Sequence, residues 1–340
     1  MKRGGDQSSI SMHLWHRFTC VIVLLCFFAL FYEISILCIY TEEKWRYRWV
    51  LAIPHQQLGN QLWIIASSYG IAKARGARWC ILDCNGQYGK YLSYLEWIVD
   101  APETCLNPYV WFWITDEFHY IPIFKLVPEN GKYATFNQEY LEAPEPHIFL
   151  PGYLQSYKYF DKAHPLPFRL AATERAQEWV KARNITAAIH IRRGDKLHDE
   201  GNVITPPSYF PVAMSVLRTL FPRQHQIFVI VTDDPQWARE QSCFHGMQML
   251  NSVADAGFDM AVISACKHKI LTIGTFGWMG AFIGDHHYQD NGTGIVVYPK
   301  AQMNSKQRTA GFKNEDYFPH HWIGIDASQY SISVTCSGSE

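Results

Sequence analysis

The second half of the chain alternates between short apolar runs and amphipathic stretches, and this alternation restricts the possible folds more than any other feature. The expected strands are 187–191, 227–231, 247–250, 270–273 and 295–297, and the expected helices between them are 211–221, 235–241, 258–267 and 276–283. Strands that alternate with helices in this way pair in parallel. The pattern predicts an α/β fold with a doubly wound parallel sheet.

The first half begins with the same kind of unit. Residues 49–53 are typical of a buried strand, and 55–61 of a polar turn. A helix then runs to Gly76, and a second strand covers 79–82. From about 88 to 168 the chain is rich in aromatic residues and prolines, and its periodicity is weak. For this middle part we expect irregular loops with short helices.

The length of 340 residues suits one large domain or two of ordinary size, and a hydrophobic content of 48% can fill a sizeable core. We predict an N-terminal lobe over 49–168 and a C-terminal lobe over 169–340, joined through a proline-rich stretch. The net charge of -1 argues against bulk electrostatic binding of nucleic acid. Any anion site must therefore be local.

Residues 18–40 form an apolar run that is long enough to cross a bilayer as a helix. Glu33 is its only charged member, and it must reach toward the membrane surface or face a partner. A cleaved signal peptide is the alternative, but the run is too long for one and no small-residue cleavage site follows it. We expect an uncleaved signal anchor, with a cytoplasmic tail over 1–17 and a stem over 41–48.

Positive charges do not decide the orientation of this span, because equal numbers of Lys and Arg flank its two ends. Two N-glycosylation sequons, at Asn184 and Asn291, favour a lumenal position for everything after the span, since such sites are used only in the secretory lumen. The sequence therefore predicts a single-pass type II membrane protein.

Six cysteines follow the span, and an even number in an oxidising lumen favours disulfides. Fifteen pairings are possible, and the sequence does not choose among them. Metal binding by these cysteines is a poor alternative. No Cys-x-x-Cys pair occurs, and three residues separate Cys80 from Cys84.

A pair of arginines follows the first strand of the second half. Arg192, Arg193 and Asp195 come directly after this strand, and Asp233 follows the next strand along the chain. Two guanidiniums at the carboxyl end of a strand are placed to clamp an anionic group, for which we expect the diphosphate of a nucleotide sugar. The alternative is an Arg–Asp ion pair that only caps the sheet.

A glycine-bearing loop at the same expected edge supports the anion site. Residues 274–277, Gly-Thr-Phe-Gly, run into a helix, so the Thr275 hydroxyl and the free N–H groups of the helix suit phosphate oxygens. The chain contains no Asp-x-Asp triplet, and the adjacent side chains of Asp233 and Asp234 diverge. No divalent metal is therefore expected beside the diphosphate, and the arginines would supply the positive charge.

Several segments, taken in order, resemble the α-1,2-fucosyltransferases. They are Leu-Gly-Asn-Gln at 58–61, Gly-Tyr-Leu-Gln-Ser at 152–156, His-Ile-Arg-Arg-Gly-Asp at 190–195, Phe-Val-Ile-Val-Thr at 228–232, Gly-Thr-Phe-Gly at 274–277, Phe-Pro at 318–319 and Trp-Ile-Gly-Ile at 322–325. The resemblance covers about 50–326. The arginine motif alone is shared with other fucosyltransferases, whereas the ordered set is specific.

The resemblance implies a GT-B fold of two Rossmann-like lobes and a type II enzyme of the Golgi membrane. Such an enzyme transfers fucose from GDP-β-L-fucose to the 2-hydroxyl of a terminal galactose, with inversion and without a metal or other cofactor. The implied partners are GDP-fucose, a galactose-terminated glycan acceptor and the membrane, and nucleic acid is not among them.

The resemblance also implies roles for single residues. Arg192 would hold the diphosphate and act in catalysis as GDP departs, while Arg193 and Asp195 would shape the loop. Asn60 would approach from the other lobe. The full set of expected donor-binding residues is His190, Arg192, Arg193, Asp195, Asp233, Thr275, Phe276 and Asn60.

An inverting transfer also raises the question of what takes the proton from the acceptor hydroxyl. In the related α-1,6-fucosyltransferases a glutamate ten residues past the motif histidine is this base, and Glu200 stands at that spacing. Glu200 is therefore the candidate base. The alternative is that Glu200 is a solvated loop acid and that stabilisation of the leaving group suffices.

One departure from the family pattern is plain. The usual Gly-Arg-Leu-Gly-Asn-Gln reads Gln-Gln-Leu-Gly-Asn-Gln at 56–61, so an expected arginine is missing. Two alternatives stay open. One is a fucosyltransferase of another linkage, or one acting on protein hydroxyls. The other is a non-catalytic, membrane-anchored glycan-binding protein with the same fold.

Overall fold

A computed structural model describes residues 48–81, 91, 93–98, 103–104, 125–129, 134–160, 166–198, 203–251, 255–288, 294–300 and 311–330. The chain divides into two compact units, Met1–Arg48 and Trp49–Glu340, and the helices and strands below belong to the second. The expected tail, the expected span and all of the stem but Arg48 lie outside the described ranges, as do Glu200 and Asn291. Within those ranges, no helix combines the length and the apolar character that crossing a membrane requires.

The second half forms a six-stranded parallel sheet, called here the C-terminal sheet, in the order β10-β9-β8-β11-β12-β13. Its strands are β8 (Ala187–Ile191), β9 (Phe228–Thr232), β10 (Gln248–Asn251), β11 (His268–Ile270), β12 (Val296–Pro299) and β13 (Ile323–Ile325). The predicted parallel sheet is confirmed. The strand expected at 270–273 begins earlier, and the strand at the β13 edge was not predicted.

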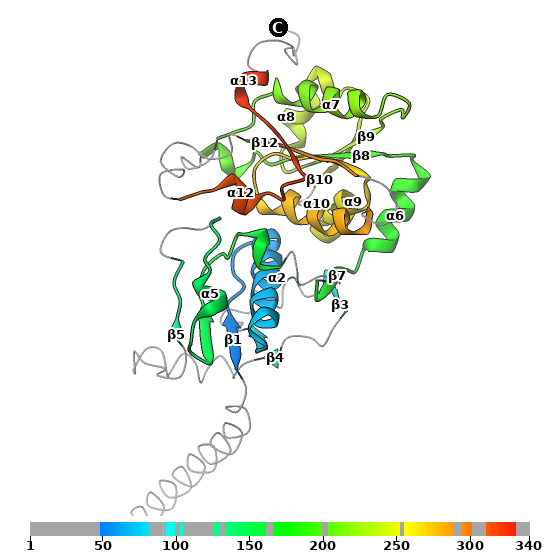
Figure 1. The fold of residues 1–340 in the computed structure, drawn as a ribbon. Coiled ribbons are helices and arrows are strands. Elements are labelled where there is room, and N and C mark those ends of the chain that lie inside the picture. Colours follow the sequence, from blue (N-terminus) through cyan, green and yellow to red (C-terminus); the bar gives the residue numbers. More distant parts are fainter. Residues whose placement is uncertain are drawn as a thin grey trace, which may run out of the picture. The chain divides into compact units, whose positions relative to one another are not determined.

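Helices cover both faces of this sheet, as a doubly wound fold requires (Figure 1). Residues of α7 (Tyr209–Leu220) and α8 (Pro235–Glu240) share one core cluster with Ile189 and Ile191. Residues of α9 (Ala256–Ala265) and α10 (Thr275–Tyr288) share the other cluster with Ala188. Because successive strand residues point to opposite faces, His190 projects toward the α9 and α10 side.

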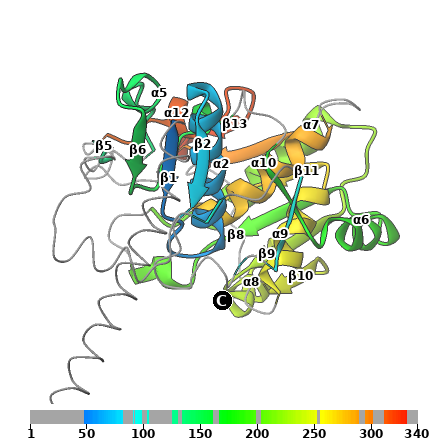
Figure 2. The same ribbon diagram turned by 90° about the horizontal axis from the view of Figure 1, so that it is seen from below.

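The first half forms a second parallel sheet, the N-terminal sheet, in the order β4-β2-β1-β6-β5. Its strands are β1 (Trp49–Ala52), β2 (Arg78–Ile81), β4 (Glu103–Thr104), β5 (Lys125–Leu126) and β6 (His147–Leu150). Helix α2 (Leu58–Arg75) lies against β1 and β2 (Figure 2). It ends as predicted at Gly76, whose φ of 59° is left-handed and whose N–H bonds the last carbonyls of the helix.

Two expectations for the first half are wrong. Strand β6 lies in the part expected to be irregular, because its four residues stand between Pro146 and Pro151, and prolines that suggested a linker instead bound a buried strand. Helix α2 begins at Leu58 and not after the polar turn, so Asn60 lies in its first turn. Asn60 and Gln61, the last residues of the expected turn, instead belong to the first turn of α2.

The remaining elements connect or border the two sheets. A two-stranded antiparallel ribbon pairs β3 (Leu95–Trp97) with β7 (Phe168–Leu170), so the chain pairs across the expected lobe boundary, which stays a prediction. Helix α6 (Thr173–Ala182) was not expected. The short helices are α5 (Glu139–Glu142), η1 (Tyr157–Tyr159), η3 (Asp195–His198), η4 (Ser242–Phe244), α12 (Asn314–Tyr317) and α13 (Ala327–Tyr330).

An aromatic cluster joins α2 to α10. Trp63 of α2 lies 3.8 Å from Trp278 of α10 and 4.9 Å from Tyr317, measured between ring centroids, and all three are buried. Large aromatic rings contribute both buried area and favourable ring contacts. The first turns of α2 and α10 are therefore held at a fixed distance from one another.

The described residues include both disulfide-bonded and free cysteines. Cys80 and Cys243 are in disulfides. Cys266 is free and buried, and burial raises the pKa of its thiol to about 12, so it is not a reactive thiolate.

Candidate active site

Arg192 occupies the carboxyl end of β8, where strand register decides its neighbours. Ile191 pairs with Thr232 of β9, so the next residues, Arg192 and Asp233, stand side by side. Arg192 Nη1 forms an ion pair with Asp233, and its Nη2 lies 2.7 Å from Asp195 Oδ1. The Arg192 backbone N–H donates to Thr272 Oγ1 at 2.8 Å. The guanidinium is thus fixed on one side, while its side chain keeps 20% exposure.

Two carboxylates face the single guanidinium of Arg192. Asp233 is nearly buried, with 7% exposure of its side chain, whereas Asp195 is 58% exposed. Asp233 also accepts the Arg193 N–H at 2.8 Å, so it holds the loop as well as the guanidinium. An incoming phosphate would therefore replace Asp195, the exposed partner, and leave Asp233 in place as the support.

Arg193 points away from Arg192. Its guanidinium lies 4.5 Å from the centroid of the Trp237 ring, and its Nε lies 3.3 Å from Asp234 Oδ2. Asp234 in turn caps α8 by accepting the Trp237 N–H at 3.1 Å. The structure therefore separates the two arginines: Arg192 faces the site, and Arg193 fastens the loop to α8 through a cation–π contact.

His190 is buried beneath the start of α10. Its ring stacks on Phe276 with centroids 5.7 Å apart, and a side chain at Gly277 would collide with His190 Nδ1. Burial lowers the pKa of His190 to about 3, and the charge of Arg192 acts in the same direction. The imidazole is therefore neutral near pH 7 and cannot act as an acid. It supports the first turn of α10 by packing.

The first turns of α10 and α2 meet at a small polar network. Asn60 Oδ1 accepts hydrogen bonds from the Thr275 hydroxyl at 2.8 Å and from Gln155 Nε2 at 3.1 Å. A Cβ atom on Gly59 would lie 2.5 Å from the Phe276 nitrogen, so only glycine permits this approach. Helix N-termini carry free N–H groups and partial positive charge, which suit a phosphate between Arg192 and α10.

Gln57 stands where the resembled family has its arginine. Its Oε1 lies 3.4 Å from Arg192 Nη2, which links the loop before α2 to the arginine motif. Gln56 precedes it with a left-handed φ of 66°. A non-glycine residue in the left-handed region costs about 1 kcal/mol or more of conformational free energy, so the loop before α2 is strained at Gln56.

Three residues around the same loop were missed from the sequence. His55 Nδ1 lies 2.9 Å from the Ile53 carbonyl oxygen, and its ring lies 4.7 Å from the ring of Tyr153. Glu129 accepts the Tyr153 and Leu154 N–H groups, each at 2.9 Å. Burial raises the pKa of the Glu129 carboxyl, against the effect of these bonds and of the nearby His55. The sequence position of His55, directly before the segment at 56–61 that resembles the family, could have indicated it as a site residue. No sequence pattern indicated Glu129.

A fourth missed residue is Asp259, in the first turn of α9. It is 3% exposed, its Oδ2 has no hydrogen-bond partner within the part of the chain that the structure describes, and burial raises its pKa to about 7, with a further contribution from Asp255. An acid in an otherwise apolar helix was the sequence signal. A buried, unpartnered carboxylate in a ligand-binding half is a candidate contact for a ligand.

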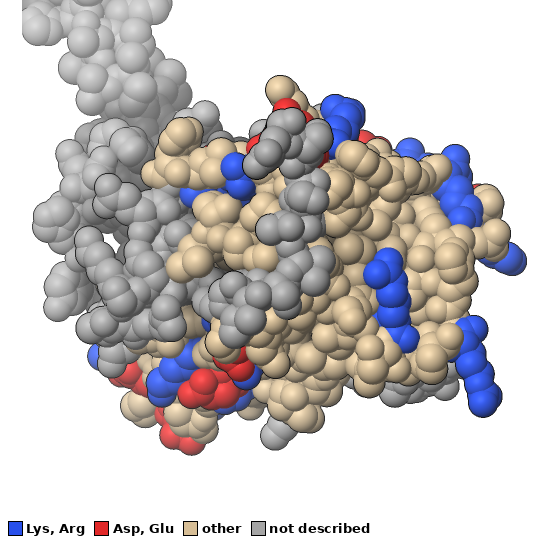
Figure 3. Space-filling view, turned by 90° about the horizontal axis from the view of Figure 1, so that it is seen from above, with Lys and Arg blue, Asp and Glu red and all other residues tan. Residues whose placement is uncertain are grey.

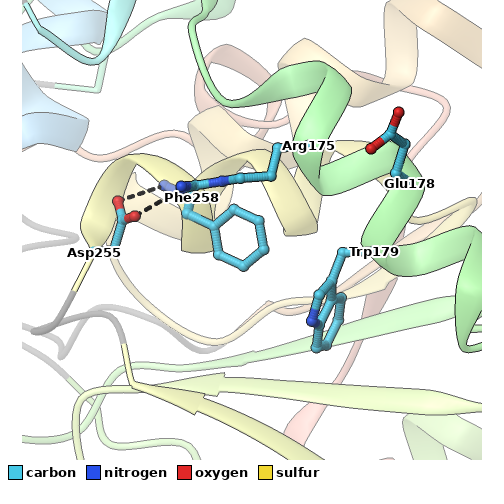
Figure 4. A pocket seen from close by; sticks show the side chains of 5 residues that line it. All are labelled: Arg175, Glu178, Trp179, Asp255 and Phe258. Atoms are coloured by element: carbon cyan, nitrogen blue, oxygen red, sulfur yellow. Dashed lines mark hydrogen bonds and ion pairs between the residues drawn. The ribbon is translucent and has the colours of Figure 1, made fainter.

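The pocket in Figure 4 is a different feature. It has a volume of about 540 Å³ and lies between α6 and α9. Arg175 Nη2 pairs with Asp255 Oδ2 at 2.7 Å, and the same guanidinium lies 4.4 Å from the Phe258 ring centroid (Figure 4). Trp179 meets Phe258 edge to face. None of the five residues that line the pocket belongs to the arginine motif or to the first turn of α10.

The described residues show neither one basic patch on the face in Figure 3 nor a cluster of metal ligands. On the face shown in Figure 3, the Lys and Arg side chains are scattered and do not form one basic patch. Among the described residues, no group of three or more His, Cys, Asp or Glu side chains could hold a metal ion. Asn184, the sequon within these residues, is exposed at the end of α6.

Gly59→Ala is expected to weaken both folding and donor binding, because the Phe276 backbone nitrogen cannot turn away from the added methyl group. We expect the free energy of unfolding to fall by about 1–3 kcal/mol, measured by urea denaturation, and GDP affinity to fall with it. Gly76→Ala is the matched control. It is also strained, at a φ of 59°, but meets nothing within 4 Å. An equal loss of GDP affinity in both variants would contradict a role for the Gly59 contact.

Comparison with known proteins agrees with the motif. The family model described as Glycosyl transferase family 11 matches residues 147–326. The galactoside 2-alpha-L-fucosyltransferase Sec1 of Mus musculus is 26% identical over 226 residues, which cover 59% of this chain and 58% of that protein. The galactoside alpha-(1,2)-fucosyltransferase 2 of Bos taurus is 28% identical over 212 residues, covering 56% and 58%. The matches thus span less than two thirds of these relatives.

Among solved structures, the fucosyltransferase NodZ from Bradyrhizobium matches with a TM-score of 0.43 and 12% identity, over 70% of this chain and 94% of that chain.

Proposed function

The chain belongs to glycosyl transferase family 11, and on this premise we propose that it transfers L-fucose from GDP-β-L-fucose to the 2-hydroxyl of a galactoside. The observation that carries the proposal is the fixed guanidinium of Arg192, whose side chain lies against Gly274, just before the first turn of α10. The names of the curated relatives support the fucose donor, the galactoside and the linkage. The two parallel sheets, each bearing a loop at the site, support a GT-B arrangement.

The reaction is a displacement at the anomeric carbon with inversion. The bond between fucose C1 and the β-phosphate oxygen breaks, and GDP leaves with the electron pair. Charge grows on the phosphate as the sugar becomes oxocarbenium-like. Arg192 and the free N–H groups of α10 stabilise that charge where it develops. Because this guanidinium and these N–H donors are part of the chain, whose sequence lacks an Asp-x-Asp triplet, the proposed transfer needs no divalent metal.

Asp259 recognises the guanine in this proposal. The base presents two adjacent donors, N1–H and the 2-amino group, and a carboxylate accepts such a pair with two oxygens. Asp259 lies on the side of the sheet toward which His190 projects, and its Oδ2 is unpartnered among the described residues. Binding of guanine would pair a carboxylate that is costly to bury alone.

The cellular setting is part of the proposal. The chain is a single-pass type II protein of the Golgi membrane, anchored through 18–40, with the enzyme in the lumen. The disulfides at Cys80 and Cys243 support an oxidising compartment, and the exposed Asn184 supports access of the sequon to glycosylation.

Transfer assays with several donors and acceptors test the activity directly. The full chain in detergent is incubated with labelled GDP-fucose, GDP-mannose and UDP-galactose, and with acceptors ending in galactose, N-acetylglucosamine or a peptide hydroxyl. We expect label only from GDP-fucose onto galactose, with an α-1,2 linkage in the product, and undiminished in EDTA. A product of another linkage, or a strict need for Mn²⁺, would refute the corresponding part; glycan binding without transfer would identify a glycan-binding protein.

A further inference from the structure

The acceptor hydroxyl must lose its proton during transfer, and His55, in the loop before α2, has one ring nitrogen that makes no hydrogen bond to the described residues. We propose that His55 is the general base that accepts the proton of the acceptor 2-hydroxyl. The inference rests on the proposed function, because it names the base for that reaction. It assigns the role to the loop before α2 and not to the loop after the arginine motif.

The tautomer of His55 is set by its hydrogen bond. Nδ1 lies 2.9 Å from the Ile53 carbonyl oxygen, and a carbonyl can only accept, so Nδ1 carries the proton. In the neutral ring the lone pair then lies on Nε2. Within the described residues Nε2 makes no hydrogen bond, and the ring is half-buried, so this lone pair is open to a substrate. A general base requires such an atom.

The position of His55 fits the stereochemistry of inversion. Attack must come from the side of C1 opposite to the departing GDP. GDP is held on the side of the C-terminal sheet by Arg192, so the base is expected from the opposite side, where the loops of the N-terminal sheet stand. His55 belongs to such a loop, and Gln57, two residues later and at most about 7 Å away along the backbone, contacts Arg192. His55 is therefore two residues from the position at which its loop contacts the phosphate clamp.

The neighbours of His55 suit both the acceptor and the proton. Tyr153 offers an aromatic ring 4.7 Å from the imidazole, tilted by 52°, which is suited to the apolar face of a galactose ring. Glu129 lies close enough to interact electrostatically with His55, and its negative charge would stabilise the imidazolium that forms. The ring is oriented by the Ile53 carbonyl, and Glu129 contributes only its charge.

The acceptor oxygen forms a bond to fucose C1, the bond from C1 to the phosphate oxygen breaks with its electrons going to GDP, and the acceptor proton moves to His55 Nε2. Glu129 itself is a poorer base. Its two oxygens already accept the Tyr153 and Leu154 N–H groups, and they lie beneath the loop where a Cβ on Gly152 would be 2.7 Å from Oε2.

Two substitutions separate a base from a residue that only shapes the loop. His55→Asn retains an N–H that can donate to the Ile53 carbonyl but removes the basic nitrogen; His55→Ala removes both. We expect both to lower transfer by about 10²–10⁴-fold, with the affinity for GDP within about twofold of wild type. Added imidazole should restore part of the activity of the alanine variant.

The outcomes distinguish this inference from the proposed function. Near wild-type transfer by His55→Asn, or a parallel loss of GDP binding in both variants, would overturn the role of base. Failure of the alanine variant to respond to imidazole while GDP binding is intact would also count against it. The wild-type chain transferring no fucose to any acceptor would instead refute the proposed function itself.

Discussion

Arg192→Ala should reduce fucose transfer by at least about 10²–10³-fold. The side chain of Arg192 lies against Gly274, just before the first turn of α10, and its loss leaves no comparable charge on this loop, because Arg193 is directed toward Trp237. The measurements are initial rates with GDP-fucose and a galactoside, together with GDP affinity by calorimetry. Because the interaction grows as the phosphate gains charge, the rate should fall more than the affinity.

Two companion variants guard against a trivial loss of folding. Arg192→Lys keeps a positive charge near Asp233 but not the planar fork, so it should fold normally and transfer slowly. Arg169→Ala removes an arginine that pairs with Glu96 on the β3–β7 ribbon, away from the arginine motif, and should leave transfer unchanged. Transfer by the Arg192→Ala protein at near wild-type rate would exclude Arg192 as the phosphate clamp.

The arginine motif shows which part of the site could be predicted from the sequence and which could not. An apolar run ending in two arginines predicted a strand with cations at its carboxyl end, and β8 has these bounds. The division of labour between Arg192 and Arg193 could not be predicted. It depends on which residues of β9 lie beside β8. In the observed register Arg192 pairs with Asp233 and Arg193 with Asp234, and a shift of one residue would change both partners.

The other side of the site was harder to predict for a physical reason. The Gly59 and Asn60 signal was visible, but Tyr153 and Glu129 come from segments that are far apart in the chain and meet only through the β5–β6 pairing and the loop that follows. The left-handed φ of 53° at Leu154 is likewise not encoded by a glycine. Contacts of this kind arise from tertiary packing, which no local pattern records.

Asp259→Asn should stabilise the ligand-free protein and weaken GDP binding at the same time. The carboxyl is buried with one oxygen unpartnered among the described residues, and an amide of the same shape avoids burying a charge. Loss of the charged acceptor for guanine should lower GDP affinity by about 10–100-fold. Inosine diphosphate lacks the 2-amino group, so wild type should prefer GDP over it, and the variant should lose most of that preference. Asp326→Asn, at an exposed acid, is the control.

The pH dependence of stability gives this prediction a second, independent measurement. Burial raises the pKa of Asp259 to about 7 from 3.8, so the folded chain binds more protons than the unfolded chain between those values. The contribution of this carboxyl to stability is therefore fully present below pH 3.8 and is lost as the pH rises through 7. The asparagine variant lacks this loss, so its advantage in the free energy of unfolding should be near zero at pH 4 and grow to at most about 4 kcal/mol at pH 8, measured by urea denaturation. A stability advantage of the asparagine variant that is the same at both pH values, or absent at pH 8, would mean that Asp259 is already paired in the ligand-free protein. Such a paired carboxylate would not be available to bind guanine.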